Sequence, residues 1–323
     1  MNQLMKLCRL SLLSTLLLCA CGDDDDDDRP PDQMSILERA QAEPSLTTLV
    51  AAVELASDDG DLVNLLGEPG SLTLFAPTNQ AFDELAIMLT GRPDAVGPDL
   101  LLPANRMLVR DVLQYHVLAM TVRASEIPFG KAIEPVGGGV FLIDQGTPPV
   151  ITDGRNRSAQ IISADLDASN GVIHIIDRVL LPADKGLVET AQALPDFTIL
   201  AEALAAADLI GVLTDPGPFT VFAPTDAAFL ALLQELKIGK TDLLANRGRL
   251  VEVLTYHVVR GRVFAAEVPL DQPITTVQGG TFRIDSGLTI VDARGRTANI
   301  IETNVIAANG VIHVIDRVLL PQP

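Results

Sequence analysis

The sequence predicts two copies of one α+β domain, arranged in tandem behind an N-terminal export signal. Three features support this fold class: a segment of about 140 residues occurs twice, helical patterning precedes strand patterning in each copy, and a short apolar run follows basic residues at the N-terminus. With 323 residues, of which 48% are hydrophobic, the chain is long enough for two ordinary domains. We expect the first domain at residues 35–183 and the second at residues 184–323.

The repeat is clearest near the end of each copy. Residues 170–182 read NGVIHIIDRVLLP and residues 309–321 read NGVIHVIDRVLLP, so that only Ile175 and Val314 differ. Two shorter motifs recur in the same order, TLFAPTN against TVFAPTD and YHV in both copies, at residues 73–79, 220–226, 115–117 and 256–258. A period of this length is too long for one unit of a solenoid, so it indicates a duplicated domain.

Each copy begins with helical patterning. Apolar residues recur at helical spacing in both copies, at Leu46, Leu49, Val50, Val53, Leu187, Val188, Leu200 and Leu204. Short strands are predicted at residues 73–76 and 220–223, and the proline that follows each of them ends the strand because it has no N–H donor. The next residues, Thr78-Asn79 and Thr225-Asp226, supply N-cap oxygens for another helix.

The second half of each copy changes from helical to strand patterning. A helix is predicted at residues 107–116 and at residues 250–257. Strand-like segments follow at residues 141–144, 161–162, 282–285 and 300–301. The Asn-Gly pairs at 170–171 and 309–310 predict hairpins, since both residue types accept positive φ, and each pair precedes a final apolar strand. Helices followed by strands favour an α+β domain over alternating parallel βαβ units.

Residues 1–20 have the form of a secretory signal. Basic residues precede an apolar run at residues 10–18, which is too short for a permanent membrane-spanning helix. The sequence LCAC at residues 18–21 resembles a bacterial lipobox, in which Cys21 is lipidated and becomes the mature N-terminus; an ordinary cleaved signal is the alternative. With a lipid on Cys21, the mature chain has no free thiol and no disulfide, because the other two cysteines are removed.

An acidic and proline-containing segment, residues 21–34, links the lipid to the domains. Six consecutive aspartates at residues 23–28 repel one another and keep the backbone extended, which is typical of a solvated tether. Alternatively, the run resembles the surface-export signals of some Gram-negative lipoproteins. It lacks the spacing and the turn glycine of a calcium loop. We therefore expect a lipid-anchored protein of the cell envelope, in the outer membrane or at the cell surface.

The net charge and the absence of known motifs argue against several classes of function. The formal net charge of −19 argues against nucleic-acid binding, which needs a basic face. The chain has no G-x-S-x-G, H-E-x-x-H or phosphate-binding glycine loop. A metal site needs three or four converging ligands, whereas each copy has two histidines far apart in sequence. We predict no catalytic residue, no cofactor and no metal.

The repeated motifs together resemble those of the fasciclin-like domain family. The resemblance rests on TLFAPTNQAF and TVFAPTDAAF, on the Tyr-His pair, and on NGVIHxIDRVLLP, all in the same order twice. It covers roughly residues 35–182 and 185–321. It implies that each domain is a bent or wedge-shaped β-sandwich with helices packed along one side. Members of this family are typically extracellular or cell-surface adhesion modules.

All four histidines lie in the repeated motifs, and we expect them to be structural. His174 and His313 interrupt an apolar strand, where a neutral imidazole can donate one hydrogen bond and accept another. His116 and His257 are expected near a helix C-terminus, where ring N–H groups can meet unpaired carbonyls. Contact with a partner and unknown catalysis are the alternatives.

Two further sets of residues are candidates, one for a structural role and one for contact with a partner. Asp177 and Asp316, each followed by an arginine, are expected to form local salt bridges or to cap strand ends. In animal relatives, residues around the Tyr-His motif are linked to receptor binding. The resemblance therefore implies partner contacts at the matching positions, which are Tyr115, His116, Tyr256 and His257.

The leading functional hypothesis is a cell-surface adhesion or protein-interaction module, held to the membrane by the lipid on Cys21. Its specificity is expected in the segments that differ between the copies, at residues 91–103, 127–139, 145–156, 237–246 and 269–280. The alternative is an envelope protein that binds a glycan, a matrix polymer or a small ligand, although a chain with no Trp and two Tyr offers few aromatic platforms for sugars. An enzyme with an unfamiliar site is the third hypothesis, and no residue stands out as its nucleophile.

Overall fold

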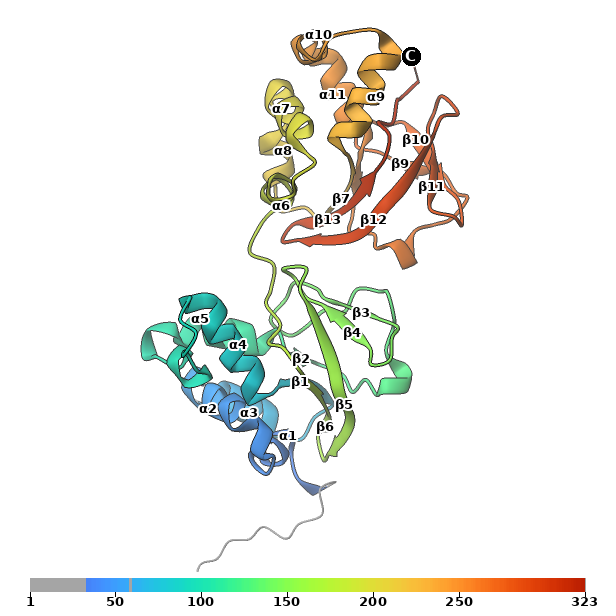
Figure 1. The fold of residues 1–323 in the computed structure, drawn as a ribbon. Helices are drawn as coiled ribbons and strands as arrows, with labels where there is room; N and C mark the ends of the chain where they lie inside the picture. The colour runs from blue at the N-terminus through green and yellow to red at the C-terminus, as the bar shows by residue number, and fades with distance from the viewer. Residues whose placement is uncertain (1–32, 58–59, 323) are drawn as a thin grey trace, which may run out of the picture.

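The computed structural model describes residues 33–57 and 60–322. Within them the chain forms two domains, each with helices on one side and a strongly curled sheet on the other (Figure 1). This confirms the predicted fold class of two α+β domains with helices along one side. The predicted signal at residues 1–20 and nearly all of the predicted tether at residues 21–34 lie outside the described residues.

The sheet of the first domain has six strands in the order β2-β1-β6-β5-β4-β3. Their bounds are β1 Leu72–Pro77, β2 Val117–Leu118, β3 Leu142–Asp144, β4 Val150–Thr152, β5 Ser158–Ala168 and β6 Gly171–Ile176. Neighbouring strands are antiparallel except β1 and β6, which run parallel with Leu72 opposite Gly171. The closing motif therefore lies in the middle of the sheet, beside the strand from the TLFAPT motif.

The second domain repeats this arrangement with seven strands in the order β8-β7-β13-β12-β11-β10-β9. Their bounds are β7 Phe219–Pro224, β8 Val258–Arg260, β9 Ile274–Thr275, β10 Thr281–Ile284, β11 Thr289–Val291, β12 Thr297–Ala307 and β13 Gly310–Ile315. The added strand β9 corresponds to a single bridge between Ile133 and Phe141 in the first domain. The central pairing of β7 with β13 is again parallel.

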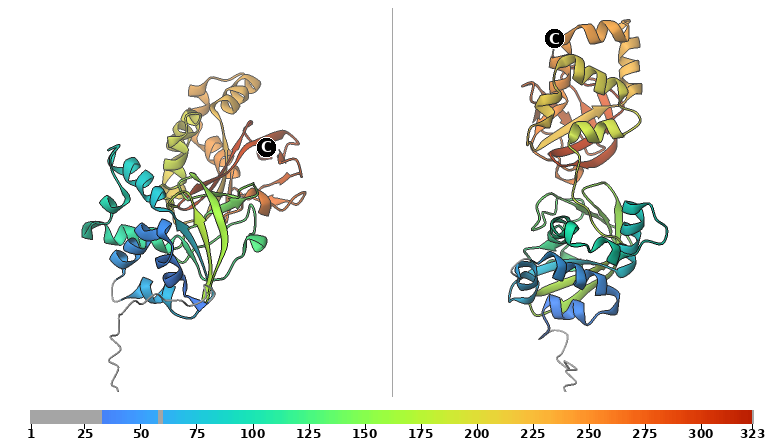
Figure 2. Two further views of the ribbon diagram at one scale, coloured as in Figure 1. Left: turned by 60° about the horizontal axis from the view of Figure 1, so that its bottom comes forward. Right: turned by 90° about the vertical axis from the view of Figure 1, so that its left-hand side faces the viewer.

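Helices cover one face of each sheet, and in both domains they lie toward the same side of the molecule (Figure 2). The α-helices of the first domain are α1 Ile36–Gln41, α2 Thr47–Ala56, α3 Asp61–Gly67, α4 Asn79–Thr90 and α5 Arg106–Gln114. Those of the second are α6 Leu187–Ala193, α7 Thr198–Ala207, α8 Ile210–Thr214, α9 Asp226–Leu236, α10 Lys240–Ala245 and α11 Arg247–Tyr256.

The predicted caps of α4 and α9 are confirmed for the two threonines. The side chain of Thr78 accepts a hydrogen bond from the N–H of Ala81, and Thr225 does the same at the start of α9. The neighbouring Asn79 has a different role, because its Oδ1 accepts from the N–H of Thr48 at 2.8 Å and so joins α4 to α2. Asp226 likewise accepts from the N–H at the second residue of α7.

Each domain has two apolar layers. In the first domain, one layer lies between the helices and the sheet and the other lies inside the bend of the sheet. The bend follows from β5, whose register with β6 shifts after Ile161 and again after Ser163. Phe75 and Phe141 meet edge to face inside this bend, with ring centroids 5.3 Å apart. The second domain keeps the same aromatic pair, with Phe222 and Phe282 at equivalent positions.

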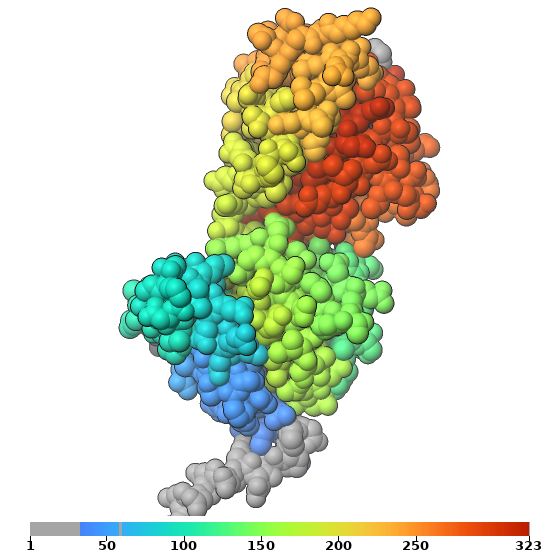
Figure 3. All heavy atoms as spheres, in the orientation of Figure 1, coloured from blue at the N-terminus to red at the C-terminus, as the bar shows by residue number. Residues whose placement is uncertain are grey.

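The two domains pack directly against each other (Figure 3). Buried apolar side chains from both domains form one cluster at the contact: Val140, Leu142, Phe264, Ile306 and Val311. At its edge, the Asn156 side chain donates to the carbonyl of Ile306 at 2.9 Å and accepts from the N–H of the same residue at 2.6 Å. This pair of bonds fixes a loop of the first domain to strand β12 of the second.

The Asn-Gly hairpins are present, and the reason given for them holds for Gly171, whose φ is +153°, but is wrong for Asn170. Ala168 pairs with Gly171, so the two-residue loop is Ser169-Asn170, and neither of these residues has positive φ. Asn170 is buried, and its side chain accepts from the N–H at the start of α1 and donates to the carbonyls of Leu66 in α3 and of Glu68 just after it. Gly171 is required because a Cβ there would lie 2.0 Å from the carbonyl oxygen of Leu72.

Candidate functional site

The histidine of each closing strand is bonded on both ring nitrogens. In β6, Nδ1 of His174 accepts from the N–H of Asp165 at 3.3 Å, and Nε2 lies 2.8 Å from the carbonyl of Val122. Because an amide N–H can only donate, the proton of this imidazole is on Nε2. The second domain repeats both contacts, at 3.3 and 2.9 Å, with His313, Asn304 and Val263.

The histidine of each Tyr-His motif takes the opposite tautomer. Nδ1 of His116 donates to the carbonyl of Val112, one helical turn earlier, at 2.6 Å. Its Nε2 accepts from the N–H of Leu180 at 2.9 Å. The second domain makes the same two bonds, at 2.7 and 2.9 Å, with His257, Val253 and Leu319. Each ring thus joins the end of a helix to the segment that follows the closing strand.

These four imidazoles are neutral at physiological pH. Burial lowers the pKa of His116 and of His257 to about 4, although the hydrogen bond to a backbone carbonyl acts in the opposite direction. Burial also lowers the pKa of His174 and of His313. Protonation would place a second N–H against an amide N–H that already donates to the ring, so the charged form loses a bond as well as its solvation.

The tyrosines of the Tyr-His motifs are also buried. Tyr115 is 1% exposed, and its hydroxyl donates to the carbonyl of Val140. Tyr256 donates to the carbonyl of Thr281 at 2.6 Å and accepts from the N–H of Ala293 at 3.0 Å. Burial raises the pKa of both phenols. Partner contact through the Tyr-His motif stays a prediction, and it would require these rings to leave the core.

A buried carboxylate that the sequence analysis did not single out completes this framework. Asp153 is 1% exposed, and its carboxylate accepts from the backbone N–H groups of Arg155, Arg157 and Leu181. The Arg157 guanidinium pairs with it at 2.8 Å. Asp292 makes the matching backbone contacts in the second domain. The shared spacing, DGRNR at residues 153–157 against DARGR at residues 292–296, was the signal that could have revealed it.

The acidic residues of the closing motif bind the neighbouring strand. Asp177 accepts from the N–H of Gln160 at 2.7 Å. Asp316 accepts from both the N–H and the side-chain amide of Asn299, each at 2.7 Å. Both carboxylates therefore hold the long bent strand beside the end of the closing strand.

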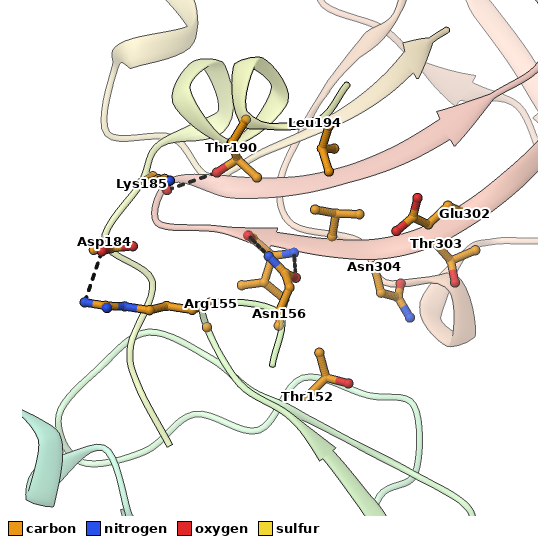
Figure 4. A pocket seen from close by; sticks show the side chains of 14 residues that line it. Thr152, Arg155, Asn156, Asp184, Lys185, Thr190, Leu194, Glu302, Thr303 and Asn304 are labelled. Carbon is orange, nitrogen blue, oxygen red and sulfur yellow. Dashed lines mark hydrogen bonds and ion pairs between the residues drawn. The ribbon is translucent and has the colours of Figure 1, made fainter. Parts of the chain in front are cut away.

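A large polar cleft lies between the two domains (Figure 4). Its volume is about 580 Å³, and hydroxyl, amide and charged side chains line it, among them Thr152, Thr190, Glu302 and Asn304. Arg155 and Asp184 form an ion pair of 3.0 Å at one side. The predicted specificity segment at residues 145–156 reaches this cleft, so it lies at a junction that only the tandem arrangement creates.

In residues 33–57 and 60–322, no three His, Cys, Asp or Glu side chains form a group that could hold a metal ion. Over that part of the chain, no helix has the length and apolar character needed to span a membrane. Cys21 lies outside the described residues.

Comparison with known proteins identifies the fold as that of a known family. The Fasciclin domain model matches residues 44–182 and 195–321. Human Periostin is 28% identical over 299 residues, which cover 90% of this chain and 32% of that protein, so the chain spans about a third of that relative. Protein sll1483 of Synechocystis sp. is 42% identical over 140 residues, covering 42% of this chain and 73% of that protein.

A solved FAS1 domain pair from the insect cell adhesion molecule Fasciclin I aligns with 84% of this chain and 97% of its own, at 19% identity and a TM-score of 0.42. The family assignment rests on the domain model, which matches most of the chain in two separate segments. These segments contain every repeated motif described above. The chain therefore belongs to the fasciclin domain family and carries two fasciclin domains in tandem.

Proposed function

We propose that this chain is a lipid-anchored bacterial envelope protein whose two fasciclin domains act as a cell-surface adhesion or protein-interaction module. Fasciclin domains occur in cell adhesion proteins. One structural observation supports the assignment most: the histidines and tyrosines of the repeated motifs are bonded to backbone groups inside each domain. Polar groups that could serve catalysis are thus used in the framework, which favours recognition by the exposed loops over chemistry.

The proposed anchor gives this module an orientation. Cys21 and the aspartates at residues 23–28 precede the first domain, and the described chain begins at the end of that domain farthest from the second (Figure 1). A lipid on Cys21 would hold the first domain nearest the membrane and present the second domain farthest from it. The acidic segment serves either as the tether or as a signal for export to the outer surface.

Surface labelling of intact cells tests this proposal. We would compare the wild type with a variant whose aspartates at residues 23–28 are replaced by Ser and Gly, using an epitope tag after the second domain and lysed cells as the expression control. Labelling of the wild type but not of the variant supports surface export, and labelling of both supports a tether. If neither is labelled in intact cells, the protein acts inside the envelope and surface adhesion is refuted.

Anchoring and adhesion need a second test of their own. Replacing Cys21 by Ala should release the protein from the membrane fraction and abolish the cell attachment that the wild type confers on a non-adherent host. Mass spectrometry of the processed N-terminus should find the lipid on Cys21 of the wild type. An unmodified N-terminus would contradict the lipobox assignment without affecting the domain-based part of the proposal.

The cleft between the domains favours a second candidate, the binding of a glycan or a small polar ligand. Hydroxyl, amide and charged groups line it, and its volume of about 580 Å³ lies within the usual range for ligand sites. A glycan array probed with the wild type and with a Glu302→Ala variant would test this. Binding that the variant loses supports the candidate, and an array without signal eliminates it for the sugars tested.

A further inference from the structure

An apolar groove opens on the helical side of the first domain. It lies between α4 and α5 and beneath the connecting segment at residues 91–105, and its volume is about 380 Å³. Phe82 and Leu85 of α4, Val109 and Val112 of α5, and Leu181 form much of its lining. Ligand sites of this size that are mostly apolar and contain a few polar groups suit small apolar or amphipathic molecules.

Exposed apolar side chains surround the mouth of this groove. Leu89, Leu102 and Leu108 line it and are each about half exposed, at 51%, 53% and 55%. Met88 and Met107 lie on the same two helices and are 49% and 62% exposed. Clustered exposure of this kind is uncommon on soluble proteins and marks binding surfaces, and methionine suits such surfaces because its side chain adapts to different shapes.

The second domain shows that the fold does not require this apolar surface. It keeps the buried positions, with Phe229 and Leu232 on α9 where α4 has Phe82 and Leu85. At the exposed positions the two copies diverge. Ile87-Met88 and Met107-Leu108 of the first domain correspond to Gln234-Glu235 and Gly248-Arg249 of the second. Leu89, which lines the groove, is matched by Leu236, which is 45% exposed, so the rim of the second copy is more polar than that of the first without being wholly polar.

Two charged side chains lie in the lining of this mostly apolar groove, and one of them, Asp99, is paired with Arg92 at 2.6 Å. Arg155 contributes to the lining, and its Nη2 forms an ion pair with Asp184 at 3.0 Å. A guanidinium carries five N–H donors, so an ion pair through one nitrogen leaves donors for a second acceptor. The corresponding Arg294 of the second domain instead donates from Nε to the carbonyl of Pro321 at 2.8 Å.

We propose that this groove binds the single acyl chain of an anionic amphiphile, such as a free fatty acid, with the carboxylate at Arg155. The chain lies along the apolar walls and displaces the water that now covers the exposed rim. The carboxylate meets the unused guanidinium donors, which can bind it in bidentate geometry. The second domain does not share this property, because its rim carries Gln234, Glu235 and Arg249.

Calorimetric titration of the purified protein with saturated fatty acids of eight to twelve carbons, each below its micellar concentration, tests this proposal. Each methylene that enters the groove should tighten binding about fourfold, until the groove is full. A Met107→Gly/Leu108→Arg variant, which carries the residues of the second domain, should lose at least tenfold in affinity. Because both side chains are exposed, its melting temperature should fall by only a few degrees, which is the cost of a glycine in the first turn of α5.

Two further variants separate the parts of the site. Arg155→Gln should weaken binding of the acids about tenfold and leave the matching primary alcohols unchanged, because only the acids need the cation. Leu236→Gln, at an exposed position of the second domain, should change neither series. Since the titration uses protein without its lipid, failure of the proposed anchor at Cys21 does not affect the outcome.

Three results would overturn the proposal. The first is an absence of measurable fatty-acid binding by the wild type. The second is equal binding by the wild type and by Met107→Gly/Leu108→Arg. The third is attachment to phospholipid vesicles, or dimerisation, that the same double variant abolishes while free fatty acids do not bind, which would assign the rim to a bilayer or to a second copy of the chain.

Discussion

Acidification should destabilise both domains through the histidines of the Tyr-His motifs. The pKa of His116 and of His257 is lowered to about 4 in the folded protein, against about 6.5 for histidine in an unfolded chain. As the pH falls below 6.5, the unfolded chain binds protons that the folded protein does not bind until about pH 4. Their contribution to stability is therefore complete above pH 6.5 and is lost progressively between pH 6.5 and 4.

The size of this loss follows from the two pKa values. Their difference corresponds to roughly 3 kcal/mol for each histidine at the acid limit, of which about 2 kcal/mol is already lost at pH 5. Urea unfolding at pH 7.5 and at pH 5.0, followed by circular dichroism, measures it. His116→Asn and His257→Asn provide the comparison, because an asparagine amide can still donate toward the helix carbonyl but does not titrate.

Each variant should be less stable than the wild type at pH 7.5, because the N–H of Leu180 or Leu319 loses its acceptor. Between pH 7.5 and 5.0, however, the wild-type domain should lose about 2 kcal/mol more than the variant domain. Carboxylates contribute equally to both proteins, so the difference isolates the histidine. If the unfolding free energy of the wild type and of both variants depended on pH in the same way, these rings would not be buried, neutral imidazoles bonded to the backbone.

Three further predictions concern the turns and the domain contact. Asn170→Ala should lower the unfolding free energy of the first domain by about 2–4 kcal/mol, since the three hydrogen bonds of its side chain are lost. Asn170→Asp should lower it further, because a carboxylate would face two carbonyls. Urea unfolding of both variants measures the order. Gly171→Ala should prevent β6 from pairing with β1, because the added Cβ would overlap the backbone of Leu72. Gly91→Ala, at a position with open space and φ of +68°, should lower the unfolding free energy by only about 1 kcal/mol. Soluble yield and melting temperature distinguish the two variants. Asn156→Ala should lower the first calorimetric transition by a few degrees, because the two hydrogen bonds of Asn156 with Ile306 are lost and because its φ of 60° disfavours alanine. An unchanged thermogram would show that these bonds do not couple the domains.

Local sequence signals were sufficient for several of the elements and for their order, but short strands such as β2 and β4 were not predicted. The threonine caps, the helix that ends in Tyr-His and the apolar closing strand depend on interactions within a few residues, which spacing and residue type reveal. The parallel pairing of β1 with β6 was not predicted. It joins residues about 100 positions apart, and their apolar patterns are the same for either strand direction.

The framework contacts were only partly predictable for the same reason. Sequence position indicated that His174 and His116 were internal, but not which backbone groups they bind, since Val122 and Leu180 lie 52 and 64 residues away. Asn170 was interpreted as a turn residue, whereas its side chain binds helices more than 100 residues earlier. Asp153 was missed because a single acidic residue in a loop ordinarily indicates solvent exposure.

The central claim is that the repeated motifs build the framework of both domains and leave recognition to the surface. Long-range proton–nitrogen NMR spectra of the imidazoles test it most directly, because the chain has only four histidines. We predict four neutral rings at pH 7, two protonated on Nδ1 and two on Nε2, with His116 and His257 titrating only near pH 4 and the pKa of His174 and His313 below its usual value. An imidazole that titrates near pH 6.5 would contradict it, because that ring would be solvated and free for chemistry or for a partner.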